Sequence, residues 1–179
     1  AGPGYGGSCF PKDTQALADI MTLQEACGTV SDTRLAYVGD GRNNVARSLM
    51  IICGKLGVNF VVGAPAELAP DEASLEYARG LAAESGASIT VETSPESAVA
   101  GADAIYTDVW ASMGEEAEAK KRAALLEPYR VTDDLMAASG KASTIFLHCL
   151  PAVKGQEVTP EVFESTASRV FDQAENRKH

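Results

Sequence analysis

Histidine is scarce in this chain, since only His148 and His179 occur among 179 residues. Imidazole is the commonest metal-binding side chain, so two of them exclude a multi-histidine metal site. The cysteines are four scattered residues without a Cys-x-x-Cys pair: Cys9, Cys27, Cys53 and Cys149. This spacing argues against a zinc knuckle or a disulfide scaffold, and it favours a reducing, cytoplasmic setting.

The chain also lacks an excess of basic residues and any long apolar run. Its formal net charge is −10, which disfavours nucleic acid and anionic membrane surfaces as partners. No apolar stretch approaches the ~20 residues of a membrane span, and no basic segment precedes a signal-like stretch. Hydrophobic residues make up 45% and charged residues 22%, an ordinary globular balance. We therefore expect one domain, or one with a small appendage.

Short apolar runs alternate with helical patterns along the chain. Strands are predicted over residues 34–38, 58–62, 88–91, 103–107 and 144–147. Helices are predicted over 45–56, 70–85, 95–100, 115–126, 132–138 and 160–165, after a first helix that begins at Asp13 or Thr14 and ends at Cys27. Such alternation predicts an α/β fold: a Rossmann-like, doubly wound, five-stranded parallel sheet with strand order 3-2-1-4-5.

The stretch from Thr144 to Pro151 is the most informative segment. Its apolar run suits a strand buried on both faces, and His148 and Cys149 follow where that strand ends. Ligands of open α/β sheets bind at the carboxyl ends of the strands, so an imidazole and a thiol lie where chemistry is expected. A buried core histidine and an inert cysteine are the alternative interpretation. Leu150–Pro151 is a candidate cis bond.

Two further loops leave the ends of the first and fourth strands. The first, Gly39 to Asn44, lacks the third glycine of a dinucleotide-binding motif, so we expect no nucleotide cofactor. Asn43 and Asn44 suit either helix caps or an amide that binds a zwitterion. The other loop offers Asp108, either as a cap or as a partner for an ammonium, and backbone N–H groups of residues 112–114 for a carboxylate. The predicted strand order brings these loops and Cys149 to one crevice.

These motifs resemble ornithine carbamoyltransferases. The resemblance rests on Leu35–Leu49 (Leu-Ala-Tyr-Val-Gly-Asp-Gly-Arg-Asn-Asn-Val-Ala-Arg-Ser-Leu), Asp108–Gly114 (Asp-Val-Trp-Ala-Ser-Met-Gly), His148–Pro151 (His-Cys-Leu-Pro) and Val170–Arg177. It covers about residues 14–179 and corresponds to the ornithine-binding domain of that family. The implied substrates are ornithine and carbamoyl phosphate, with no metal and no cofactor.

The resemblance also implies roles for individual residues. The residues implied for the amino-acid end of ornithine are Asn44, Asp108, Ser112 and Met113. Cys149 and the carbonyl of Leu150 are implied beside the reacting amine, with Cys149 and Asp108 as the catalytic pair. An incomplete set is implied for carbamoyl phosphate: Gln15, His148 and Arg177.

The chain departs from the family pattern in two places. It contains no Ser-Thr-Arg-Thr-Arg phosphate loop, and residues 12–15 read Lys-Asp-Thr-Gln where the family has His-Pro-Thr-Gln. We therefore expect the ornithine-binding half of the enzyme, very weak or inactive alone. The alternative is a non-catalytic Rossmann-like scaffold or amino-acid-binding module. A surface left uncovered by a missing domain would favour self-association.

The first residues resemble a different family. Gly2–Thr14, with Gly-Gly-Ser-Cys-Phe-Pro-Lys-Asp at its centre, is similar to the catalytic-cysteine loop of UDP-glucose and GDP-mannose dehydrogenases. That resemblance implies a nucleophilic Cys9 with Lys12 as its neighbour. We interpret the chain as a chimera of a dehydrogenase-like segment, 1–13, and a carbamoyltransferase domain, 14–179. A remnant UDP-sugar dehydrogenase is the third functional alternative.

Overall fold

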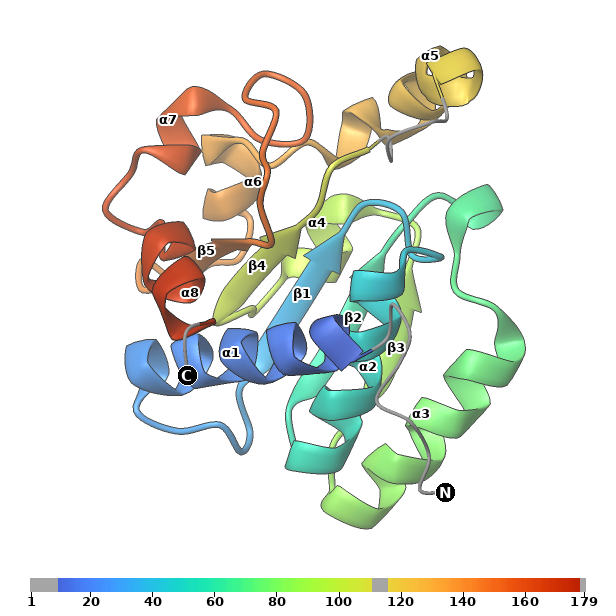
Figure 1. The fold of residues 1–179 in the computed structure, drawn as a ribbon, viewed down its shortest axis with the longest axis vertical. Helices are drawn as coiled ribbons and strands as arrows, with labels where there is room; N and C mark the ends of the chain where they lie inside the picture. The colour runs from blue at the N-terminus through green and yellow to red at the C-terminus, as the bar shows by residue number, and fades with distance from the viewer. Residues whose placement is uncertain (1–9, 111–115, 178–179) are drawn as a thin grey trace.

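A five-stranded parallel sheet forms the centre of the molecule (Figure 1). The computed structural model describes residues 10–110 and 116–177, with 10–14 and 116–119 described by their backbone alone. The strands are β1 Arg34–Val38, β2 Asn59–Gly63, β3 Ile89–Glu92, β4 Ala104–Thr107 and β5 Ile145–His148. Their order is β3-β2-β1-β4-β5, and every neighbouring pair is parallel. The predicted fold class and strand order are therefore confirmed.

The helices follow the strands as the alternation predicted. They are α1 Phe10–Cys27, α2 Asn44–Leu56, α3 Glu72–Ser85, α4 Pro95–Val99, α5 Glu116–Leu126, α6 Asp133–Ala137, α7 Pro160–Phe163 and α8 Val170–Asn176, with short 3-10 turns η1 Ala66–Leu68 and η2 Glu127–Tyr129. Side chains cap several of them at the first turn: Asn43, Asp71, Ser94, Thr132 and Thr159. These caps satisfy backbone N–H groups that a helix cannot satisfy itself, which explains why each helix begins there.

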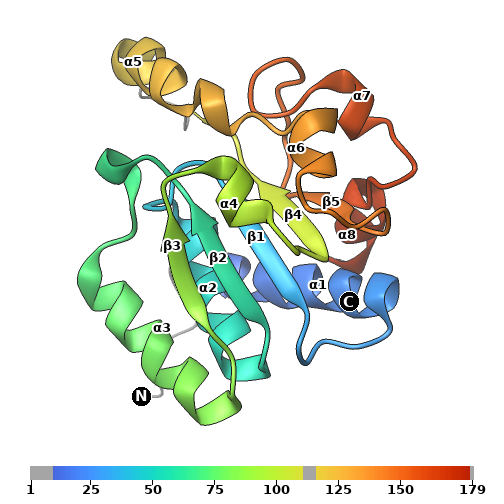
Figure 2. The same ribbon diagram turned by 180° about the vertical axis from the view of Figure 1, so that it is seen from behind.

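Alternating side chains of the strands divide the core into two layers. One face of the sheet is covered by α1, α2 and α3, and the other by α4, α6, α7 and α8 (Figures 1 and 2). In β1, for example, Leu35 and Tyr37 belong to the first layer, while Ala36 and Val38 belong to the second. The period of two along each strand therefore buries both faces of the sheet.

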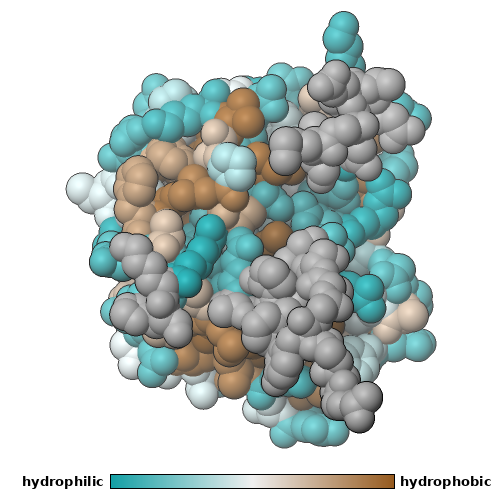
Figure 3. Space-filling model, viewed as in Figure 1, coloured by the Kyte–Doolittle hydropathy of each residue, from teal (hydrophilic) through white to brown (hydrophobic). Residues whose placement is uncertain are grey.

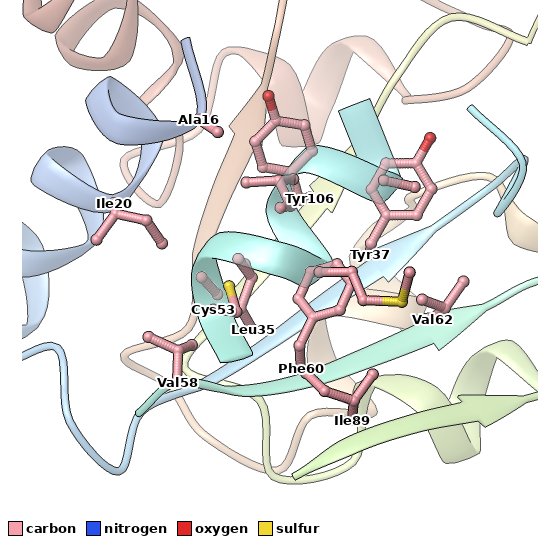
Figure 4. Packing of buried hydrophobic residues seen from close by; sticks show 14 of the residues in the cluster. Ala16, Ile20, Leu35, Tyr37, Cys53, Val58, Phe60, Val62, Ile89 and Tyr106 are labelled. Atoms are coloured by element: carbon pink, nitrogen blue, oxygen red, sulfur yellow. The ribbon is translucent and has the colours of Figure 1, made fainter. Parts of the chain in front are cut away.

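The first layer contains the largest aromatic side chains of the core. Figure 4 shows Tyr37, Phe60 and Tyr106 between the sheet and the helices α1 and α2. The rings of Tyr37 and Tyr106 stack with centroids 6.1 Å apart, and both side chains are buried. Burial of such rings stabilises the fold strongly, because each removes a large apolar area from water.

The predicted start of the first helix is wrong. Helix α1 begins at Phe10 and not at Asp13 or Thr14, so the predicted boundary between residues 13 and 14 falls inside one helix. Proline is compatible with the first turn of a helix, because the N–H that it lacks would have no helical partner there. Pro11 therefore did not need to precede the helix. The predicted strand ends differ from the observed ones by about one residue, as is usual for element boundaries.

An apolar groove lies on the outer side of α1, α2 and α3. It is lined by Ala16, Leu17, Ser48, Ile51, Ile52, Lys55 and Tyr77. Leu17 and Tyr77 are exposed, and Figure 3 shows apolar surface next to α1 and α2. Within the described residues, no helix is both long and apolar enough to cross a bilayer. Self-association through a surface left uncovered by a missing domain stays a prediction.

Candidate functional site

Three loops meet at the carboxyl ends of β1, β4 and β5. Asp108, directly after β4, lies at their centre with its side chain largely buried. Its Oδ2 accepts a hydrogen bond from Asn43 Nδ2 at 2.6 Å, and its Oδ1 accepts one from Cys149 Sγ at 2.8 Å. The backbone N–H of Val109 also donates to Oδ1, at 2.7 Å. One carboxylate thus joins the loops that follow three different strands.

The amide that reaches Asp108 belongs to Asn43, whereas the sequence resemblance assigned the amide role to Asn44. Asn43 is the cap of α2: its Oδ1 accepts the N–H of Val45 at 2.8 Å, which directs its Nδ2 toward Asp108. Asn44 is the first residue of α2 and is exposed. The cap interpretation is therefore confirmed for Asn43, whereas binding of a zwitterion by Asn44, whose side chain is exposed, stays a prediction.

Cys149 carries a neutral thiol in this environment. Burial raises the pKa of the Cys149 thiol well above that of a free cysteine, and the nearby charge of Asp108 and its hydrogen bond raise the pKa further. The thiol therefore keeps its proton at neutral pH and donates it to Asp108. Cys149 is not a thiolate nucleophile of the kind that a cationic neighbour or a helix N-terminus produces.

His148 is fully buried, and both of its ring nitrogens have partners. Nδ1 accepts the N–H of Leu150 at 2.8 Å, so Nε2 carries the ring proton and faces Glu157 Oε1 at 3.2 Å. The same oxygen of Glu157 accepts the N–H of Val153 at 2.5 Å. Both ring nitrogens thus have partners within or next to this loop, and the contact of His148 with carbamoyl phosphate that the family resemblance implied stays a prediction.

Leu150 turns the loop sharply after Cys149. Its backbone is in the left-handed region, with φ of 51°, and the Leu150–Pro151 bond is cis, as the sequence suggested. A branched side chain rarely adopts such a φ, so surrounding contacts must hold it there. The hydrogen bond from Leu150 N to His148 Nδ1 is one of them.

Arg177 ends α8 close to the same site. Its Nε and Nη2 atoms are buried and have no hydrogen-bond partner among the residues that the structure describes. Its positive charge opposes the burial-driven rise in the pKa of both Asp19 and Cys149, so the guanidinium lies near both groups. A buried donor without an acceptor is costly, and an anion beside Arg177 would remove that cost.

The remaining predicted residues are placed as follows. Gln15 is half-buried on α1, and the described structure gives it no hydrogen bond to Asp108 or Cys149. Ser112, Met113 and Cys9 lie outside the described residues, as does the side chain of Lys12. Among the residues that are described, no group of three or more His, Cys, Asp or Glu side chains is placed to hold a metal ion.

An open pocket lies at the same edge of the sheet. Its volume is about 290 Å³, and its lining residues are Arg42, Glu67, Leu68, Lys121, Arg122 and Leu125. Asp40 forms ion pairs with two of these lining residues. Its Oδ1 lies 3.7 Å from Arg42 Nε, and its Oδ2 lies 3.4 Å from Arg122 Nη1. Three cations and one acid among the lining residues give the pocket a positive balance.

Comparisons with known proteins identify the family of the chain. Residues 31–179 match the family model described as aspartate/ornithine carbamoyltransferase, Asp/Orn binding domain. An ornithine carbamoyltransferase from Caldanaerobacter subterraneus subsp. tengcongensis is 54% identical over 166 residues, which are 93% of this chain and 53% of that protein. The anabolic ornithine carbamoyltransferase of Pyrococcus furiosus is 51% identical over 174 residues, 97% of this chain and 55% of that protein.

Solved structures show the same relationship. Ornithine carbamoyltransferase from Pyrococcus furiosus superposes with a TM-score of 0.87 at 51% identity, over 92% of this chain and 52% of that one. The enzyme from Gloeobacter violaceus gives a TM-score of 0.84 at 40% identity, over 92% and 54% of the two chains. The chain spans about half the length of the curated relatives that it matches. It belongs to the aspartate/ornithine carbamoyltransferase family, and what it carries is that family's Asp/Orn binding domain.

Proposed function

We propose that this chain is the ornithine-binding half of an ornithine carbamoyltransferase. The observation that carries the proposal is the meeting of three loops at Asp108, where Asn43 and Cys149 both bind its carboxylate. A carboxylate, an amide and a thiol at one edge suit a small zwitterion with a second amine. Asn44, Asp108, Ser112 and Met113 would hold its amino-acid end. Its side-chain amine would lie beside Cys149 and the Leu150 carbonyl.

The proposed reaction is transfer of a carbamoyl group from carbamoyl phosphate to that amine. The neutral amine attacks the carbamoyl carbon, a C–N bond forms, and phosphate leaves with the electron pair of the broken C–O bond. The nitrogen must then lose one proton. Because the Cys149 thiol already donates to Asp108, its sulfur can take the amine proton while its own proton passes to the carboxylate. Cys149 and Asp108 therefore act as one proton-accepting unit.

Rate in such a reaction depends on cations that stabilise the departing phosphate. Within the described part of the chain, Arg177 Nε and Nη2 have no hydrogen-bond partner, which supports the phosphate-binding role that the family resemblance gives Arg177. The sequence contains no Ser-Thr-Arg-Thr-Arg segment that would add further cations. We therefore propose that ornithine binding survives in this chain and that turnover by the chain alone is very weak.

Titration calorimetry with ornithine tests the proposal. We expect the wild type to bind, and Asp108→Ala to weaken binding about tenfold or more, since a charge-assisted contact is worth about 1.5–3 kcal/mol. Glu84→Ala is the control, because it removes an exposed carboxylate of α3. No heat at millimolar ornithine would overturn the proposal. Robust citrulline formation by the chain alone would contradict only its predicted weak turnover.

A further inference from the structure

A buried polar cluster lies beneath the loop that carries Cys149. The Tyr106 hydroxyl donates to Asp19 Oδ2 at 2.8 Å, and Gln173 Nε2 donates to Asp19 Oδ1 at 2.6 Å. Gln173 Nε2 also lies 3.1 Å from the Tyr106 hydroxyl oxygen. On its other side, Gln173 Oε1 accepts the backbone N–H of His148 at 2.9 Å. The cluster thus ends one residue before the site thiol.

The orientation of the Gln173 amide follows from these partners. Its oxygen must face the N–H of His148, and its nitrogen must face the acceptors Asp19 and Tyr106. Gln173 is fully buried, and Asp19 is 1% exposed. A polar group buried this deeply is tolerated only where its hydrogen bonds are made, so each member of the cluster depends on the others.

The cluster connects elements that are distant in the sequence. Asp19 lies on α1, Tyr106 on β4 and Gln173 on α8. The His148 amide that Gln173 binds lies on β5. Figure 4 shows Tyr106 and Ala16 of α1 among the side chains of the same core cluster. A second polar contact holds α8 to α1, since Asn176 Nδ2 donates to Thr22 Oγ1 at 3.0 Å and to Glu25 Oε2 at 2.8 Å. Movement of α8 would therefore pull on the residue before Cys149.

We propose that Gln173, held by Asp19 and Tyr106, is a positioning residue that fixes the Cys149 loop through the His148 amide. This inference rests on the proposed function, because the loop matters for chemistry only if ornithine binds beside it. Gln173 does not touch the reacting atoms. It fixes the position of the His148 backbone, one residue before the thiol. It also links that backbone to α8, the helix that Arg177 follows.

The charge state of Asp19 affects this buried polar cluster. Burial raises the pKa of Asp19 to about 6, against the opposing hydrogen bonds from Gln173 and Tyr106 and the charge of Arg177. Asp108 adds a smaller rise to the same pKa. The two buried thiols that also face Asp19, Cys53 and Cys149, have raised pKa values and stay neutral. A carboxylate introduced at position 173 would therefore lie next to one negatively charged side chain, that of Asp19.

Two substitutions separate positioning from simple packing. Gln173→Leu removes the acceptor for the His148 N–H together with the donor to Asp19. Gln173→Glu keeps that acceptor but places a carboxylate against Asp19, so the pair must share a proton to restore the cluster. Gln24→Leu, an exposed change on α1, is the matched control.

The first measurement is hydrogen exchange of the His148 amide by NMR, which requires no ligand. We expect Gln173→Leu to lose about tenfold or more of the wild-type protection, since the His148 amide loses the acceptor that Gln173 Oε1 provides. Gln173→Glu should keep protection near pH 5, where the Asp19–Glu pair shares a proton, and lose it near pH 8, where the two carboxylates repel each other.

The second measurement is ornithine affinity at the same two pH values, each divided by that of the wild type. Gln173→Glu should bind nearly as the wild type does near pH 5 and about tenfold more weakly near pH 8. An affinity ratio that does not change with pH, or unchanged His148 protection in Gln173→Leu, would overturn the inference. If Gln173→Leu does not fold, the comparison of Gln173→Glu at the two pH values still tests the positioning role of Gln173.

The two proposals fail in different ways. If the wild type does not bind ornithine, the proposed function fails, and exchange at His148 still shows whether Gln173 holds the loop. If the wild type binds and the Gln173 variants bind equally at both pH values, the positioning role fails alone.

Discussion

The substitution Asp19→Asn should remove a specific pH dependence from the stability of this domain. In the folded chain, burial raises the pKa of Asp19 from 3.8 to about 6. In the unfolded chain, the same carboxyl ionises near its ordinary value. Between these two pKa values, the folded protein binds a proton that the unfolded chain has already lost. The free energy of unfolding must therefore fall as the pH rises through this range.

The size of the change in unfolding free energy follows from the pKa shift of Asp19. A rise of about two pKa units corresponds to about 3 kcal/mol, at about 1.4 kcal/mol for each unit. Asp19 is 1% exposed, so solvent screening does not reduce this value greatly. The contribution is fully present below about pH 4 and is lost as the pH rises through 6. An asparagine cannot ionise, yet its amide can still accept from Gln173 and face the Tyr106 hydroxyl.

Urea denaturation followed by circular dichroism, repeated from about pH 4 to about pH 8, measures this difference. The stability of the wild type minus that of Asp19→Asn should fall by about 3 kcal/mol across the range. Other carboxylates contribute equally to both proteins and cancel in the difference. Glu84→Gln, an exposed change, should give a flat difference curve. Parallel curves for wild type and Asp19→Asn would refute the reasoning.

Two more predictions concern the site thiol and the sheet. Cys149 should react with iodoacetamide much more slowly than the half-exposed Cys27 at neutral pH, because burial and Asp108 keep its thiol protonated; equal rates by mass spectrometry would contradict this. Gly63→Ala should destabilise the domain by about 1–3 kcal/mol, since the new Cβ would lie 2.7 Å from Ala98 Cβ. Gly80→Ala is the matched change at an exposed position of α3, where a new Cβ would have no atom within 4 Å. It should stabilise the domain by up to about 1 kcal/mol. Urea denaturation measures both changes.

The strand order could be predicted because two signals agree. Continuous apolar runs such as residues 145–147 indicate strands buried on both faces, and helices between them require parallel crossovers. The predicted starts of α3 at residue 70 and of α6 at residue 132 lie within two residues of the observed starts. The start of α1 could not be predicted in this way, because the Pro11 region suits both a loop and a first helical turn.

The site was harder to predict than the sheet for a geometric reason. Asn43 and Asn44 are adjacent and chemically identical, and only the backbone decides which one caps α2 and which one faces solvent. Asp19 had a signal that could have been used. It lies three residues after Ala16 and four before Leu23, so it shares their buried helical face. Its partner Gln173 is 154 residues away, and no local pattern connects them.

Burial and the nearby acids of this domain keep the Cys149 thiol from ionising. Asp108 directly accepts the Cys149 proton, and the charges of Asp108 and Asp19 both disfavour a thiolate. A free thiolate would attack electrophiles such as a carbamoyl group, whereas a neutral thiol bound to a carboxylate can only exchange protons. Under the proposed function, the same negative charges attract the ammonium form of a diamino acid. One carboxylate, Asp108, would then both recognise the amine and keep the sulfur protonated.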